Sequence, residues 1–122
     1  MKKINCFITG ITGMVGSHLV DFILEKTDWN IYGLLRWSSK LDNIEHHLEA
    51  INKKKRLHLV YGDLTDHVSI RNALNISCPN YVFHLAAETF PKMSFDAPLK
   101  FYDTNIKGTQ ILLEEIKNLN KI

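Results

Sequence analysis

The chain has 122 residues, 45% hydrophobic and 23% charged, which is enough to bury the core of one globular domain. Its formal net charge of +2 argues against a nucleic-acid partner, and no stretch approaches the ~20 apolar residues that a membrane span needs. Cys6 and Cys78 do not suggest a disulfide framework, so we expect a cytoplasmic protein without a signal peptide. The basic run Lys53–Arg56 is expected to be a solvated loop.

Short apolar runs alternate with segments of helical periodicity along the chain. In chain order, we predict a strand at 4–9, a helix at 14–26, a strand at 31–35, a helix at 41–51, a strand at 57–61, a helix at 66–74, a strand at 81–85 and a helix from about 96 to 119. The apolar sides of the first and last helices are expected to be Val15, Leu19, Phe22 and Ile23, and Tyr102, Ile106, Leu113 and Ile116.

A glycine-rich loop joins the first strand to the first helix. Gly10 permits a sharp turn off the strand, Gly13 lets backbone amides approach a pyrophosphate, and Gly16 permits close packing of the helix. The amino terminus of that helix would present free N–H groups to the phosphates. This position and spacing predict a dinucleotide site, with a glycine-rich turn that binds no ligand as the alternative. A P-loop is excluded because no Gly-Lys-Ser/Thr follows.

The end of the second strand indicates which dinucleotide binds. An acidic residue there bonds the ribose 2′-hydroxyl of NAD, whereas an arginine suits the 2′-phosphate of NADP. The sequence has Arg36, followed by Ser38 and Ser39, and no carboxylate before Asp42. We therefore predict NADP, held by a charge-assisted fork from Arg36 and by hydroxyl donors. The alternative is NAD, with Arg36 as a surface charge.

Strands that alternate with helices of this length require crossover connections and a parallel sheet. We predict an α/β fold, a Rossmann-type parallel sheet in strand order 3-2-1-4 with helices on both faces. Residues 1–122 are interpreted as an NAD(P)-binding half-domain of about four strand–helix units, without a substrate domain.

Further segments match a known family. With the glycine spacing, Gly62–Leu64, Val82–Glu88 and Thr104–Thr109 resemble the extended short-chain dehydrogenase/reductase family, whose members mostly modify nucleotide sugars. Most similar to its GDP-mannose 4,6-dehydratases are the segments Leu35–Ser39, Ile44–His46, Tyr61–Asp66 and Lys92–Asp96. Leu85–Glu88 is closer to the dTDP-glucose 4,6-dehydratases. The resemblance covers nearly all of this chain but only the first part of a family member.

The resemblance also implies roles for single residues. The pyrophosphate would contact Thr9, Gly10, Gly13, Met14, Val15 and Gly16. Arg36 and Ser38 would hold the 2′-phosphate, and Asp63 and Leu64 would line the adenine pocket. Leu85, Ala86 and Ala87 would border the nicotinamide-side ribose. Two alternatives stay open, because Asp63 could cap the helix that follows and Ala86–Ala87 could serve packing alone.

The catalytic residues of the family are not found in the chain. The family uses Tyr-x-x-x-Lys after a fifth strand, and none of the four tyrosines has a lysine at that spacing. We predict no catalytic residue and no metal site, and we expect the isolated chain not to catalyse. The open edge of the fourth strand and the half-covered last helix are expected to make a homo-oligomer.

For the whole protein, the resemblance implies an NADP-dependent nucleotide-sugar 4,6-dehydratase, a lyase whose substrate is a nucleotide sugar. One alternative is a nucleotide-sugar 4-epimerase or reductase of the same family. The other is a non-catalytic NAD(P)-binding sensor or interaction module.

Overall fold

The computed structural model describes residues 3–36, 55–87 and 95–119. Their elements are β1 (Asn5–Thr9), α1 (Met14–Lys26), β2 (Asn30–Leu35), β3 (Leu57–Tyr61), α3 (His67–Ser77), β4 (Tyr81–His84), α5 (Pro98–Phe101), the π-helical turn η2 (Tyr102–Lys107) and α6 (Gly108–Leu119). The helix predicted at 41–51 lies outside the described residues. Within the described ranges, no helix has the length and apolar character that crossing a bilayer requires.

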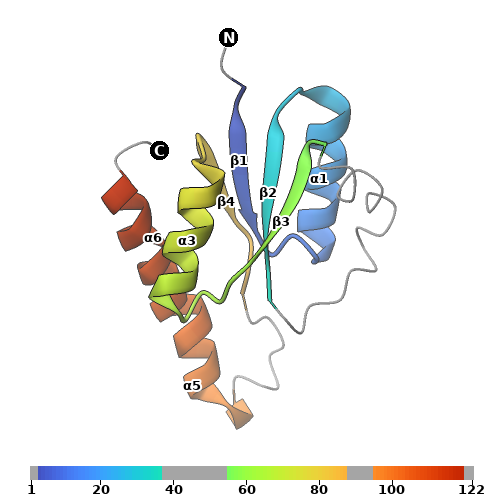
Figure 1. Ribbon diagram of the computed structural model, residues 1–122. Helices are drawn as coiled ribbons and strands as arrows, with labels where there is room; N and C mark the ends of the chain where they lie inside the picture. Colours follow the sequence, from blue (N-terminus) through green and yellow to red (C-terminus); the bar gives the residue numbers. More distant parts are fainter. Residues whose placement is uncertain (1–2, 37–54, 88–94, 120–122) are drawn as a thin grey trace.

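The four strands form one parallel sheet in the order β3-β2-β1-β4, which confirms the predicted fold class and strand order. Phe7 in the middle of β1 pairs with Tyr32 on one side and with Val82 on the other. Helix α1 lies on one face of the sheet, and α3 and α6 lie side by side on the opposite face (Figure 1). The carboxyl ends of all four parallel strands therefore meet at one edge.

The sheet separates two apolar clusters, and β1 contributes to both because its side chains alternate between the faces. Phe7 packs with the α3 and α6 side, whereas Cys6 and Ile8 pack with the α1 side. All three are fully buried, as expected for a strand covered on both faces. Burial raises the pKa of Cys6 to about 11, so this thiol behaves as a small apolar side chain.

The apolar face predicted for α1 is wrong in part. Its buried residues are Gly16, Ser17, Val20 and Ile23. Val15 and Phe22 are exposed, and of the predicted residues only Ile23 is buried. The reason is that small residues form the contact at the start of the helix, where its backbone approaches the preceding loop.

The last helical segment also differs from the prediction. The turn Tyr102–Lys107 is π-helical, so an extra residue per turn rotates the residues before it relative to α6. The buried residues of α6 are Gly108, Ile111, Leu112 and Glu115. Tyr102, Ile106 and Leu113, which were predicted on the apolar side, are exposed. A single α-helical period cannot describe both sides of this irregular turn.

Arg56 corrects the prediction that the whole basic run is a solvated loop. Its guanidinium is half-buried and donates to three backbone carbonyls near the end of α1, those of Leu24, Thr27 and Trp29. Carbonyls at the end of a helix lack intrahelical partners and attract cations. Arg56 thus ties the start of β3 to the end of α1.

Candidate functional site

A cavity of about 380 Å³ lies at the edge where the strands end. Its lining comes from the glycine loop, the ends of β2 and β4, the segment after β3, and the π-helical turn: Gly10, Thr12, Gly13, Met14, Val15, Gly16, Leu34, Arg36, Asp63, Leu64, Leu85, Ala86, Ala87 and Thr104. All predicted site residues line it except two. Thr9 is buried behind the loop, and Ser38 lies outside the described residues.

The glycine loop has the conformation that its glycines permit. Gly10 has a φ of +74°, and a Cβ there would lie 2.8 Å from the backbone nitrogen of Ala86. A Cβ on Gly16 would overlap the carbonyl oxygen of Gly10. Each of these positions therefore excludes a side chain, and the loop lies directly against the backbone after β4.

The start of α1 faces the cavity with its backbone uncovered by any capping side chain. Gly13 is the N-cap residue, and no side-chain hydrogen bond caps the helix there. Met14 and Val15 follow, with 74% and 65% of their surfaces exposed, and both line the cavity. Free N–H groups and the positive end of the helix dipole make such a helix terminus suited to a phosphate.

Arg36 follows the last residue of β2 and is exposed at the cavity wall. Its guanidinium is the cationic side chain of the described cavity lining. A fixed fork of N–H donors at this place fits an anionic group on a ligand that lies across the sheet edge.

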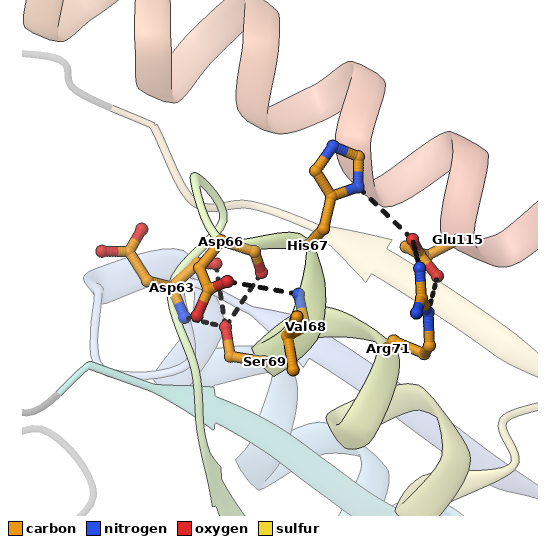
Figure 2. Close-up of polar contacts among 7 residues, drawn as sticks. All are labelled: Asp63, Asp66, His67, Val68, Ser69, Arg71 and Glu115. Carbon is orange, nitrogen blue, oxygen red and sulfur yellow. Dashed lines mark hydrogen bonds and ion pairs between the residues drawn. The ribbon is translucent and has the colours of Figure 1, made fainter.

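Asp63 and Asp66 have different roles in the segment after β3. The Asp63 carboxylate accepts from the backbone N–H and the hydroxyl of Thr65, at 2.9 and 2.8 Å. Asp66 is the N-cap of α3 and accepts from the Val68 N–H (Figure 2). The interpretation of Asp63 as the helix cap is therefore wrong. Asp63 instead forms an Asx turn at the cavity wall.

The wall after β4 is fixed from behind by Thr9. The Thr9 hydroxyl accepts from the backbone N–H of Ala86 at 3.0 Å and contacts the His84 ring at 2.7 Å. Burial lowers the pKa of His84, which favours its neutral form. Thr9 thus supports the wall, and its predicted contact with pyrophosphate stays a prediction.

The structure adds Thr12, Leu34 and Thr104 to the predicted lining. Thr12 sits inside the glycine loop, and its position between two required glycines could have indicated exposure to the ligand space. Thr104 comes from the π-helical turn, 20 residues after the end of β4 at His84, and no local pattern places it here. Elsewhere, the described residues contain no group of three or more His, Cys, Asp or Glu side chains able to hold a metal ion.

The family model for GDP-mannose 4,6 dehydratase matches residues 7–122, which is nearly the whole chain. This chain belongs to the GDP-mannose 4,6-dehydratase family. Among its curated relatives, a GDP-mannose 4,6-dehydratase of Sordaria araneosa is 40% identical over 94% of this chain and 20% of the relative. A GDP-mannose 4,6 dehydratase of Drosophila melanogaster is 36% identical over 90% of this chain and 29% of the relative. The chain therefore spans less than a third of the length of these relatives.

Solved structures agree on the fold. A UDP-glucose 4-epimerase of Thermotoga maritima, solved with UDP-glucose, has a TM-score of 0.80 and 27% identity over 95% of this chain and 35% of the epimerase. A UDP-glucose 4-epimerase of Thermus thermophilus in complex with NAD has a TM-score of 0.80 and 25% identity over 97% of this chain and 35% of the epimerase. The family member described here thus shares a Rossmann-type fold with nucleotide-sugar epimerases.

Proposed function

We propose that this chain is the NADP-binding, N-terminal part of a nucleotide-sugar 4,6-dehydratase, and that residues 1–122 form a cofactor-binding half-domain. The observation that carries the proposal is the cavity at the carboxyl edge of the sheet, where the glycine loop, the start of α1 and Arg36 converge. Membership in the GDP-mannose 4,6-dehydratase family supports the substrate class, a nucleotide sugar. Two free cysteines and a small net charge support a cytoplasmic location without a nucleic-acid or membrane partner.

The residues present fit a dinucleotide. The amides at the start of α1 would hold the pyrophosphate, because the turn at Gly10 and the bare Gly13 leave them accessible. Arg36 would bind the 2′-phosphate, with Ser38 as a hydroxyl donor beside it. Asp63 and Leu64 would border the adenine, and the small side chains of Ala86 and Ala87 would leave room for the nicotinamide-side ribose.

When bound, NADP supplies the acceptor and donor of hydride that oxidation and later reduction of the sugar require. This chain would contribute binding and orientation. The tyrosine, lysine and serine or threonine of the family's proton chemistry are not among its residues at the required spacing. We therefore expect no turnover of GDP-mannose by these 122 residues alone.

The proposal is tested by titrating the chain with NADPH and, separately, with NADH, and following nicotinamide fluorescence. We expect tighter binding of NADPH, and Arg36→Ala should weaken it by about 1.5–3 kcal/mol because a charge-assisted bond is lost. NADH affinity should stay the same in this variant. Lys55→Ala is the matched control. Lys55 is an exposed cation just before β3, so it lies at the amino ends of the parallel strands, away from the cavity at their carboxyl ends.

The NAD complex of the Thermus thermophilus epimerase favours NAD as the second candidate. Equal affinities for NADPH and NADH, or an Arg36→Ala variant that weakens both to the same extent, would support NAD and reject the role of Arg36. Absence of binding by either nucleotide would favour an interaction module whose cofactor site no longer functions.

A further inference from the structure

We propose that His84 is a positioning residue of the cofactor site: as the neutral Nε2–H tautomer, it connects the cavity wall at Ala86 to the π-helical turn through Thr9 and Thr109. The inference rests on the proposed cofactor function and assigns to this site a support that no cavity-lining residue provides. It is carried by an uninterrupted series of hydrogen bonds whose direction can be worked out.

The direction begins at Thr109 on α6. Its hydroxyl donates to the backbone carbonyl of Asn105 at 2.7 Å, which uses its one proton. The same hydroxyl oxygen lies 2.9 Å from Nε2 of His84. Because the hydroxyl can only accept there, Nε2 of His84 must carry the proton.

The other ring nitrogen then has the opposite role. In the neutral ring, Nδ1 of His84 is an acceptor, and Oγ1 of Thr9 lies 2.7 Å from it. Thr9 donates its hydroxyl proton to the ring and accepts the backbone N–H of Ala86 at 3.0 Å. The bonds therefore point one way, from Ala86 through Thr9, His84 and Thr109 to Asn105, and such series strengthen one another.

A protonated His84 would break this order. Both ring nitrogens would then donate, so Thr9 would receive protons from Nδ1 and from Ala86 while its own proton lost the ring as acceptor. Thr9 is fully buried, where an unpaired hydroxyl is costly. Burial also lowers the pKa of His84, in agreement with a neutral ring.

Both ends of the series reach the cavity. Ala86 lines it directly, and its backbone nitrogen lies only 2.8 Å from the place of a Cβ on Gly10, so Thr9 holds the β4 wall where it meets the glycine loop. At the other end, Asn105 belongs to the π-helical turn that carries Thr104 into the cavity lining. The His84 ring thus links two walls that come from segments far apart in the chain.

Two substitutions separate the sides of the ring. His84→Gln keeps an amide donor near Nε2 for Thr109 and removes the acceptor of Thr9, whereas His84→Asn places an amide oxygen near Nδ1. The matched control is His58→Gln. His58 is a half-buried histidine on β3, and its ring stacks on that of Tyr32 with 4.8 Å between the ring centroids.

The first measurement needs no cofactor. Nitrogen NMR of the imidazole rings should show His84 as the Nε2–H tautomer, and exchange of the Ala86 amide should become about tenfold faster in His84→Gln but not in His58→Gln. The exchange rate of the Ala86 amide in His84→Asn should be closer to that of the original chain than to that of His84→Gln. An Nδ1–H tautomer, the reverse order of the two variants, or equal Ala86 exchange in His84→Gln and His58→Gln overturns the inference.

The second measurement is NADPH affinity at equal folded fraction. We expect about a fivefold loss in His84→Gln, the scale of one hydrogen bond, and no loss in His58→Gln. Faster Ala86 exchange with unchanged NADPH affinity would overturn the positioning role. If neither the original chain nor any variant binds NADPH, the proposed function fails. The tautomer of His84 and the exchange rate of the Ala86 amide still decide the hydrogen-bond arrangement in that case.

Discussion

At the scale of single residues, the site is built by positions where a side chain is excluded as much as by those that carry one. Gly33 on β2 illustrates this outside the glycine loop. A Cβ there would overlap Cδ1 of Ile11 and lie 3.0 Å from its Cγ2. Ile11 belongs to the glycine loop and is fully buried, so this contact fixes the loop to β2, the strand that Arg36 follows.

Gly33→Ala should therefore destabilise the fold by about 1–3 kcal/mol, the cost of overpacking a buried site. The β-branched Ile11 has little freedom to move away. Urea unfolding measures the change. Adding Ile11→Val to Gly33→Ala removes the nearest carbon and should recover a large part of the loss. If Gly33→Ala is as stable as the original chain, the contact does not hold the loop.

At the scale of elements, α3 and α6 are joined by a buried carboxylate. Glu115 on α6 is only 4% exposed, and both of its oxygens accept from the Arg71 guanidinium on α3, each at 3.1 Å (Figure 2). His67 adds a contact through Nδ1 at 3.3 Å. The hydrogen bonds from Arg71, more than the contact with His67, hold the pKa of Glu115 below its usual value.

This pair predicts a dependence of stability on pH. The pKa of Glu115 is lower in the folded chain than in the unfolded one, so its contribution is present above about pH 4.5 and is lost as the pH falls. Glu115→Gln should lower the free energy of unfolding by about 1 kcal/mol near pH 7. The cost should already be smaller at about pH 4, because the unfolded chain then binds a proton at Glu115 that the folded chain still excludes.

Urea midpoints at the two pH values measure this effect. Glu114→Gln is the control, because Glu114 is the exposed neighbour on the same helix. A difference between Glu115→Gln and Glu114→Gln that does not change with pH would reject the ionic role of Glu115.

The elements also show what local patterns can predict. The strands at 57–61 and the helix at 14–26 were predicted with the bounds of β3 and α1, because runs of apolar residues and glycine signals are local. The π-helical turn was not predicted, since its backbone depends on a tertiary contact. Gly108 packs so closely against Leu64 that a Cβ on Gly108 would lie 3.0 Å from the Cβ of Leu64. The choice between Asp63 and Asp66 as the helix cap likewise depended on where α3 begins, because the two aspartates lie three residues apart just before it.

At the scale of the whole molecule, parallel strands bring the site together. The glycine loop, Arg36 and Ala86 are separated by many residues, yet each follows the carboxyl end of a strand and all line one cavity. The sequence predicted this much, because the fold class places those ends at one edge. It did not predict that Thr9 lies behind the cavity or that Thr104 lies in it, since both depend on tertiary packing.

The helices on the outer face predict self-association of the chain. Large apolar side chains on the α5–α6 segment are exposed, between 52% and 75%: Leu99, Tyr102, Ile106 and Leu113. Within the described part of the chain, β4 pairs only with β1, so its other edge carries unpaired backbone groups. Exposed apolar side chains beside an open sheet edge favour contact with another molecule.

We expect sedimentation velocity to show an increase in mean mass as the concentration of the chain rises. Ile106→Lys combined with Leu113→Lys should suppress this increase, because each buried contact would then require a desolvated charge. Val68→Lys is the matched control, since Val68 is equally exposed, at 59%, but lies on α3. A monomer at every concentration would reject the predicted homo-oligomer. Suppression by Val68→Lys to the same degree would instead place the contact on α3 and away from the α5–α6 surface.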